Sequence, residues 1–122
     1  TARDICGLEE PVSGRLGDLG IIAARANTIS TLAGKLADGS IRLSVGADPE
    51  QTAAQLMELP GIGAWTAGYM AMRASGWTDA FLETDHGIKK ALAPRKAGEI
   101  RELAERWRPW RSYAMMNLWN SL

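Results

Sequence analysis

Apolar residues recur at the spacing of an α-helix along most of the chain. The first clear stripe predicts a helix over about 22–36, and it consists of Ile22, Ala26, Ile29, Ala33 and Leu36. Gly39 then favours a helix end. A second helix is predicted from residue 49, because Asp48 can cap it, Pro49 suits its first turn and Glu50 complements the positive end of its dipole.

The second half of the chain has the same character. A stripe at i, i+3, i+4 and i+7 predicts a helix that contains Ile100, Leu103, Ala104 and Trp107. Pro109 then interrupts the pattern, and a last helix is predicted from about residue 110. Only residues 40–45 alternate like a strand, and a single short strand has nothing to pair with. We therefore predict an all-α fold, with a single domain over residues 1–122.

A glycine-rich turn leads from the helix at residue 49 to a new helix that is predicted to begin at Ala64. The turn reads Leu-Pro-Gly-Ile-Gly at 59–63, and the whole unit is a helix–hairpin–helix over about 49–75. The glycines allow a tight turn, and the free N–H groups of the new helix form an anion site that fits a DNA phosphate. We expect this contact to involve Gly61, Ile62, Gly63, Ala64 and Thr66. The alternative is a plain pair of helices that uses glycine only for tight turning.

Composition and charge refine this picture. The 122 residues are 46% hydrophobic and 23% charged, as in soluble globular proteins, and no apolar run approaches the roughly 18 residues that a membrane span needs. Residues 1–58 carry 5 basic and 8 acidic side chains, a balance of −3, whereas residues 59–122 carry 9 and 6, a balance of +3. The second half therefore suits an anionic partner. The single cysteine, Cys6, favours a cytoplasmic protein and excludes an all-cysteine metal site.

Three stretches of the second half resemble a known family. They read LPGIGAWTAGYMAMR at 59–73, DAFLETDHGIKKAL at 79–92 and RWRPWRSYAMMNLW at 106–119. Their order and spacing are similar to those of the helix–hairpin–helix DNA glycosylases, most of all the AlkA-type branch of 3-methyladenine DNA glycosylase II. Since proteins of that branch also carry an N-terminal mixed α/β domain, we expect this chain to be the C-terminal portion of a longer protein.

The resemblance implies a role in base-excision repair. The expected reaction is hydrolysis of the N-glycosidic bond of alkylated purines, such as 3-methyladenine and 7-methylguanine, by a monomer that flips the base out of double-stranded DNA. The resemblance gives the catalytic role to Asp85, the base pocket to Trp65, Tyr69 and Trp119, and backbone binding to the hairpin. It implies no cofactor other than a Na⁺ or K⁺ ion at hairpin carbonyls, for which we expect Leu59 and Ile62.

Asp85 also makes chemical sense by itself. It lies at the predicted start of a helix, where N–H groups favour an ionised carboxylate, and Thr84 is a candidate cap. Breaking a glycosidic bond builds oxocarbenium character on the sugar, which a fixed anion stabilises. An alkylated purine already carries positive charge, so the site needs no strong general acid. The alternative is that Asp85 only caps the helix.

Aromatic side chains form the other half of the expected site. Trp65 and Tyr69 lie at i and i+4 on one helical face, and Trp119 lies on the last helix, opposite to Trp110. Electron-rich rings suit a cationic flipped base, whereas we expect Trp107 and Trp110 to be core residues. Family members that cut the DNA strand place a lysine at position 65. Tryptophan cannot form a Schiff base, which favours a monofunctional glycosylase.

Charged side chains are weaker candidates. We expect Arg108 and Arg111 to contact phosphates and His86, directly after Asp85, to line the pocket. A solvated surface position is the alternative for each. Two other functions stay open: a non-catalytic DNA-binding module or the glycosylase part of a fused adaptive-response regulator, and a glycosylase for mismatched or oxidised bases.

Overall fold

The computed structural model describes residues 1–8 and 11–122, and its regular structure is helical. That part of the chain contains eight helices and no strand. The helices are α1 (Ala2–Cys6), α2 (Val12–Gly17), α3 (Ala23–Ala37), α4 (Pro49–Met57), α5 (Ala64–Ala74), α6 (His86–Ala91), α7 (Ala97–Glu105) and α8 (Arg111–Asn120). The predicted all-α fold is confirmed. None of the helices within the described ranges combines the length and the apolar character that crossing a bilayer requires.

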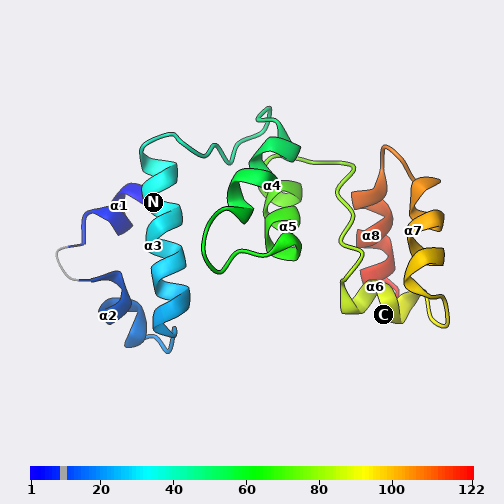
Figure 1. Ribbon diagram of the computed structural model, residues 1–122, viewed down its shortest axis with the longest axis horizontal. Helices are drawn as coiled ribbons and strands as arrows, with labels where there is room; N and C mark the ends of the chain where they lie inside the picture. Colours follow the sequence, from blue (N-terminus) through cyan, green and yellow to red (C-terminus); the bar gives the residue numbers. More distant parts are fainter. Residues whose placement is uncertain (9–10) are drawn as a thin grey trace.

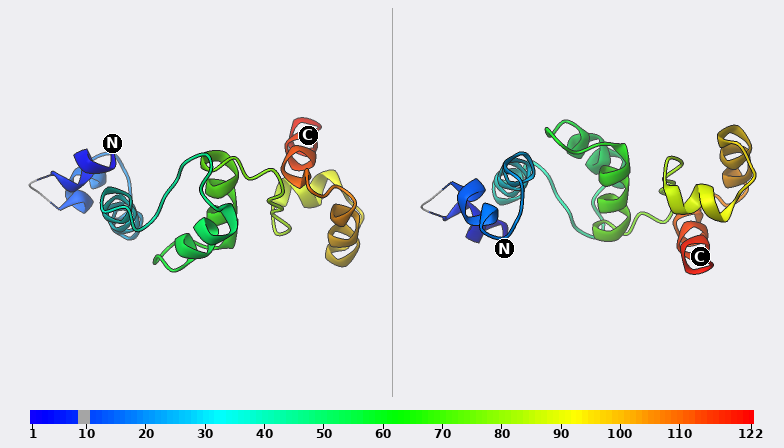
Figure 2. Two further views of the ribbon diagram at one scale, coloured as in Figure 1. Left: turned by 90° about the horizontal axis from the view of Figure 1, so that it is seen from above. Right: turned by 90° about the horizontal axis from the view of Figure 1, so that it is seen from below.

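The helices form three groups that lie in a row along the longest axis of the molecule (Figure 1). The first group contains α1 and α2, which pack on α3, and the second is the pair of α4 and α5. In the third group α6 packs on α8, with α7 beside them (Figure 1). The same order is visible from above and from below (Figure 2), with the N-terminus in the first group and the C-terminus in the third.

Local sequence explains where the helices of the first two groups begin and end. α3 contains the first predicted stripe from Ala26 onward, with Ile22 as its N-cap, and ends before Gly39, whose φ of +80° lies in the left-handed region. α4 begins at Pro49, as predicted. The carboxylate of Asp48 caps this helix by accepting hydrogen bonds from the backbone N–H groups of Glu50 and Gln51 at 3.0 and 3.1 Å.

Two clusters of buried apolar side chains hold the groups together. The first contains Ile41, Leu56, Leu59, Ile62 and Ala67. Residues 40–45 form no strand, and Ile41 instead packs against the hairpin in this cluster. The second cluster joins α5 to the third group and contains Met72, Ala80, Leu82, Ile88, Leu92, Ile100 and Met115. Tyr69 and Trp119 pack at its edge, which places the expected site beside the second cluster.

The two tryptophans expected in the core occupy different positions. Trp107 lies in the turn after α7 and packs, partly buried, against the second cluster, as predicted. Trp110 directly precedes α8 and is 57% exposed, and its ring lies 5.8 Å from that of Tyr113 in an edge-type arrangement. The core prediction for Trp110 is therefore wrong. Pro109 ends the helical pattern, so the spacing of the preceding stripe no longer places Trp110 on the buried face.

Candidate functional site

Asp85 occupies the N-cap position of α6, directly before His86. Its Oδ1 atom accepts a hydrogen bond from the backbone N–H of Ile88 at 2.9 Å. This contact satisfies one of the donors that a helix start leaves free. The prediction that Asp85 begins a helix is confirmed, whereas Thr84 lies one position too early to be the cap.

The same carboxylate accepts hydrogen bonds from two tryptophans on other helices. The indole Nε1–H of Trp65 on α5 donates to Oδ2 of Asp85 at 2.9 Å. The indole Nε1–H of Trp119 on α8 donates to Oδ1 at 2.8 Å. Asp85 therefore links α5, α6 and α8. Capping the helix and facing the aromatic residues are two simultaneous properties of one side chain.

These donors decide the protonation state of Asp85. Its partial burial acts to raise the pKa. The hydrogen bonds from Trp119, from the backbone N–H of Ile88 and from Trp65 outweigh that effect, and they hold the pKa of Asp85 below its ordinary value of 3.8. At neutral pH the site therefore carries an ionised carboxylate whose negative charge is stabilised by neutral donors.

The structure brings the three expected pocket aromatics together around this carboxylate. The rings of Trp65 and Tyr69 stack, with centroids 5.2 Å apart and planes inclined by 6°. The Tyr69 ring lies 6.3 Å from that of Trp119, at an angle of 52°. Trp65 is 40% exposed, so part of its ring stays open to solvent. We call Trp65, Tyr69, Asp85 and Trp119 the aromatic–carboxylate cluster.

The surface beside this cluster is hollowed. A depression of about 230 Å³ is lined by Ala64, Trp65, Phe81, Leu82, Glu83 and Thr84. Another of about 240 Å³, between the end of α5 and α8, is lined by Met72, Arg73, Gly76, Trp77, Thr78, Ser112, Tyr113 and Met116. Only the first of these two depressions includes a member of the cluster, so it is the one that bears on the site.

The predicted helical hairpin is formed by α4 and α5, with residues 58–63 between them. α5 begins at Ala64, as expected, and Gly63 is its N-cap. No side chain in the described residues caps α5, so the N–H groups of its first turn lack a side-chain acceptor. Ile62 is buried in the first core cluster, and its N–H donates to the carbonyl of Leu59 at 3.1 Å. Any contact of Ile62 with a ligand therefore goes through its backbone.

The two hairpin glycines, Gly61 and Gly63, lack a side chain for different structural reasons. Gly61 has a φ of +86°, and a Cβ atom there would lie 2.5 Å from Oγ1 of Thr28 on α3. The Thr28 hydroxyl occupies this space because it donates to the carbonyl of Pro60 at 2.8 Å. The missing side chain of Gly61 therefore makes room for Thr28 inside the molecule and does not open the turn to a phosphate. A Cβ on Gly63 would meet open space, so only Gly63 leaves the outer face of the turn clear.

Comparisons with known proteins identify relatives of this chain. No family model matches the chain. The chain is 43% identical over 110 residues to the probable bifunctional transcriptional activator/DNA repair enzyme AlkA of Mycobacterium tuberculosis (strain CDC 1551 / Oshkosh). It is 40% identical over 101 residues to DNA-3-methyladenine glycosylase 2 of Escherichia coli (strain K12). The chain is a homologue of the AlkA-type DNA glycosylases.

The homology concerns one region of longer proteins. The match covers 87% of this chain and 22% of the Mycobacterium tuberculosis protein, and 83% of this chain and 36% of the Escherichia coli protein. A DNA-3-methyladenine glycosylase of Bacillus subtilis (strain 168) is 36% identical over 75 residues, which cover 55% of this chain and 24% of that protein. The matched region thus spans between 22% and 36% of the length of these AlkA-type relatives.

Sequence reasoning missed one residue of the site in this AlkA-type homologue, Gly87. A Cβ atom at Gly87 would lie 3.0 Å from Oδ1 of Asp85 and 3.0 Å from Cδ1 of Trp119. The absence of a side chain therefore lets the Trp119 indole come within hydrogen-bonding distance of Asp85. The sequence did offer a signal, because Gly87 lies inside a predicted helix. Glycine at such a position costs about 1 kcal/mol relative to alanine, so its presence suggests that close packing leaves no room for a side chain.

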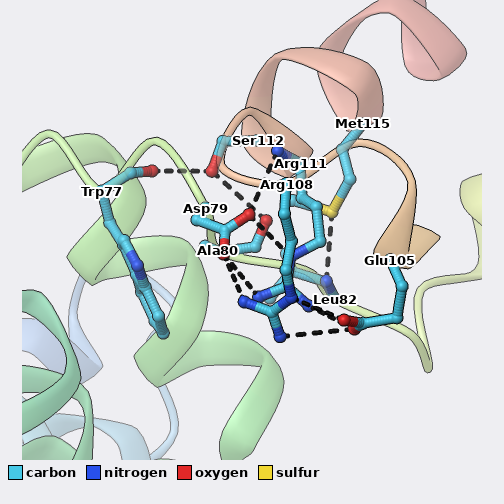
Figure 3. Close-up of polar contacts among 9 residues, drawn as sticks. All are labelled: Trp77, Asp79, Ala80, Leu82, Glu105, Arg108, Arg111, Ser112 and Met115. Atoms are coloured by element: carbon cyan, nitrogen blue, oxygen red, sulfur yellow. Dashed lines mark hydrogen bonds and ion pairs between the residues drawn. The ribbon is translucent and has the colours of Figure 1, made fainter. Parts of the chain in front are cut away.

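The remaining predicted residues lie outside the aromatic–carboxylate cluster. His86 is exposed at the first position of α6. Arg111 donates to both carboxylate oxygens of Asp79, at 2.7 and 2.9 Å (Figure 3). Arg108 donates to Asp79 at 2.5 Å and to Glu105 at 2.6 Å. Both guanidinium groups are thus paired within the chain, an arrangement that does not favour the phosphate contacts expected for them.

Proposed function

We propose that this chain forms part of a monofunctional DNA glycosylase that removes alkylated purines, such as 3-methyladenine and 7-methylguanine, from double-stranded DNA. The observation that carries the proposal is the ionised Asp85 carboxylate held by the indoles of Trp65 and Trp119. The homology to AlkA-type glycosylases supports the reaction class. The charge, the aromatic rings and the glycine hairpin each match one need of such an enzyme.

Asp85 would act on the sugar. As the bond between C1′ and the purine nitrogen breaks, its electron pair leaves with the base and positive charge develops on the deoxyribose. A fixed anion stabilises that charge, and a water molecule then supplies the hydroxyl group to C1′ and releases a proton. An alkylated purine leaves as a neutral base, because it carried positive charge before the bond broke. A single carboxylate therefore suffices.

The aromatic residues would hold the flipped base. A positively charged purine is attracted to the electron-rich faces of Trp65 and Tyr69 by stacking and cation–π interaction, worth about 0.5–2 kcal/mol. The indole N–H groups point at Asp85, so the rings and the carboxylate are held in one arrangement before DNA binds. No lysine stands at position 65, so this position cannot form the Schiff base of a strand-cleaving mechanism.

The hairpin would hold the DNA backbone. The N–H groups around Gly63, Ala64 and Thr66 carry the positive end of the α5 dipole, which suits a phosphate. The carbonyls of Leu59 and Ile62 have the oxygen chemistry that Na⁺ and K⁺ accept, and we propose them as ligands of such an ion. The Leu59 carbonyl already accepts one hydrogen bond within the turn, so a cation would use its second lone pair.

One comparison favours a second candidate function. The relative in Mycobacterium tuberculosis is described as a bifunctional transcriptional activator and DNA repair enzyme, and the chain matches 22% of its length. The chain would then be the glycosylase part of an adaptive-response regulator. The chemistry proposed for Asp85 is the same in both cases.

The test is Asp85→Asn in the full-length protein. Asparagine keeps the size and can still accept from Ile88, but it removes the negative charge. Loss of one such electrostatic partner costs about 10²–10³-fold in rate, so we expect single-turnover excision from methylated DNA to slow at least about a hundredfold. Binding to DNA with an abasic analogue should stay equal or improve, because repulsion between Asp85 and phosphates disappears.

Asp48→Asn is the matched control. Asp48 caps α4 with the same side chain but lies outside the aromatic–carboxylate cluster. Asparagine is about as good a cap as aspartate, so this variant should melt and excise like the wild type. Near-normal excision by folded Asp85→Asn would refute the catalytic role, and loss of folding in Asp85→Asn alone would show that the capping contact dominates.

A further inference from the structure

Asp85 stands at the end of a non-helical segment, residues 75–85, that connects α5 to α6. Such a segment has no internal ladder of backbone hydrogen bonds, so its buried polar groups need partners elsewhere. Figure 3 shows that these partners lie largely on α8 and on the turn before it. The position of Asp85 therefore depends on how this segment sits against α8.

The first turn of α8 holds the beginning of the segment. The hydroxyl of Ser112, which is 3% exposed, donates to the carbonyl of Trp77 at 2.6 Å and to that of Ala80 at 3.2 Å (Figure 3). The backbone N–H of Ser112 donates to the carbonyl of Thr78 at 2.9 Å. The hydroxyl and the backbone N–H of one buried residue thus hold three carbonyl groups of the segment.

The same face of α8 continues toward Asp85. Met115, at i+3 from Ser112, is fully buried and its sulfur accepts the N–H of Leu82 at 3.1 Å (Figure 3). Trp119, at i+7, donates to Asp85 at 2.8 Å. Residues at i, i+3 and i+7 lie on one face of a helix. This stripe therefore contacts successive residues of the segment and fixes its register along α8.

An ion pair fixes the same register from the side. The Arg111 guanidinium donates two parallel hydrogen bonds to Asp79, from Nε to Oδ1 at 2.7 Å and from Nη2 to Oδ2 at 2.9 Å (Figure 3). The side chains are only 12% and 16% exposed, which shields the pair from water. Arg111 also donates to Glu105 at 3.2 Å, and this carboxylate keeps the guanidinium plane in place. Two-point contact with a planar fork specifies orientation as well as distance.

We propose that Arg111 and Asp79 are a positioning pair that sets the register of residues 77–85 on α8 and thereby places Asp85. This inference rests on the proposed catalytic role of Asp85. A shift by one residue in an extended segment moves the chain by about 3.3 Å, and a misplacement of about 1 Å can cost about a hundredfold in rate. Arg111 acts through Asp79 and the segment, without touching the substrate.

The experiment uses Arg111→Lys in the full-length protein. Lysine keeps the positive charge but cannot make the two-point contact, so the segment loses one of the contacts that fix its register. We expect single-turnover excision at saturating methylated DNA to slow at least about tenfold, while the dissociation constant for abasic-analogue DNA stays within about threefold of the wild type. A phosphate-binding arginine would give the opposite split, with weaker binding and an unchanged rate, and that result would overturn the proposal.

Arg101→Lys is the matched control. Arg101 binds Glu83 of the same segment at 2.7 Å, but the two side chains are 62% and 45% exposed. An exposed pair of this kind contributes little, so Arg101→Lys should excise at the wild-type rate. Asp79→Asn tests the pair from the other side and keeps the shape of the carboxylate, so it decides the outcome where Arg111→Lys fails to fold. Wild-type excision by folded Asp79→Asn would overturn the proposal.

A double variant separates positioning from general stability. If Arg111 acts through Asp85, adding Arg111→Lys to Asp85→Asn should slow excision by less than about threefold more, because the two losses are not additive. A full additional loss would show that Arg111 acts independently of Asp85 and would refute the inference. Normal excision by Asp85→Asn would instead refute the proposed function, whereas a slow Asp85→Asn with a fast Arg111→Lys would refute only the positioning role.

Discussion

The carboxylate of Asp85 joins three helices through three donors, the backbone N–H of Ile88 and the indoles of Trp65 and Trp119. Each donor is neutral, so hydrogen bonds from uncharged N–H groups stabilise the negative charge. A carboxylate held in this way stays ionised yet keeps its charge available to a positive neighbour. The arrangement suits a reaction in which positive charge develops only at the transition state.

Gly87 makes this arrangement sterically allowed, which leads to a prediction at the residue scale. In Gly87→Ala the new methyl group would press on Asp85 and Trp119, each 3.0 Å from the Cβ position. We expect the Trp119 indole to move away from Asp85 and excision to slow by about tenfold or more, since displacements of about 1 Å are costly in a preorganised site. Single-turnover excision together with tryptophan fluorescence would measure both effects.

Gly98→Ala serves as the control for this variant. Gly98 lies in α7, and a Cβ atom there would meet open space. Alanine is the better helix former, so Gly98→Ala should be at least as stable as the wild type and equally active. Equal activity of Gly87→Ala and Gly98→Ala would show that the packing around Gly87 has no influence on the reaction.

The sequence identified the side chains that surround Asp85, but only some of the contacts among them could be predicted from local patterns. Trp65 and Tyr69 are four residues apart, so helical periodicity alone places them on one face. The hydrogen bond from Trp119 spans 34 residues, and no local pattern encodes it. The predicted cap was displaced by one residue, from Asp85 to Thr84, because both side chains are good caps and the helix start can shift by one position.

At the scale of elements, the hairpin separates two uses of glycine, and the variants Gly61→Ala and Gly63→Ala test them. Gly61 needs a φ of +86° and would clash with Thr28, whereas Gly63 has a φ of −93° that any residue adopts. We expect Gly61→Ala to lower the free energy of unfolding by at least about 1 kcal/mol and Gly63→Ala to change it by less than about 0.5 kcal/mol. Urea unfolding would measure the difference.

A larger side chain at Gly63 should affect DNA binding more than it affects stability. Gly63→Val places a branched side chain on the open face of the turn, beside the first N–H groups of α5. We expect weaker binding to duplex DNA and a flatter salt dependence, because a phosphate contact is lost. Unchanged affinity of a folded Gly63→Val protein would exclude the hairpin from DNA binding.

Helix starts with strong local signals were predictable, and the connecting segment was not. Asp48 as a cap and Pro49 in the first turn predict the start of α4, and the helix begins there in the structure. Residues 75–85 carry no periodic pattern, and their partners Ser112 and Met115 lie more than thirty residues away. Arg111 illustrates the consequence, since sequence alone could not distinguish a phosphate ligand from the partner of Asp79.

At the scale of the whole molecule, the groups of helices lie in a row and carry different parts of the proposed task (Figure 1). The second group supplies the hairpin together with Trp65 and Tyr69. The third supplies Asp85 and Trp119, and the hydrogen bond from Trp65 to Asp85 crosses between the two groups. The excess of basic residues in this half, +3 over residues 59–122, agrees with a partner as anionic as DNA.

The stability of the molecule should depend on pH through two carboxylates, Asp79 and Asp85. For Asp79, burial acts to raise the pKa, but hydrogen bonding and charge attraction from Arg111 outweigh it and lower the pKa below 3.8. The pKa of Asp85 is lowered as well, by the donors already described. A group whose pKa is lower in the folded state stabilises the protein above its unfolded pKa, and that stabilisation is lost as the pH falls through the folded value.

We therefore expect the free energy of unfolding to be insensitive to these two groups above about pH 5 and to decrease as the pH falls from there toward 2. Asp85→Asn should be less stable than the wild type at pH 7, because one indole N–H loses its acceptor, at a cost of about 1–3 kcal/mol. The wild type loses its ionised acceptor on acidification too, so the difference between the two proteins should shrink toward pH 2. Urea unfolding at pH 7, 4 and 2 measures it. A constant difference across that range would mean that Asp85 titrates alike in the folded and unfolded chains, and that the indoles do not hold its charge.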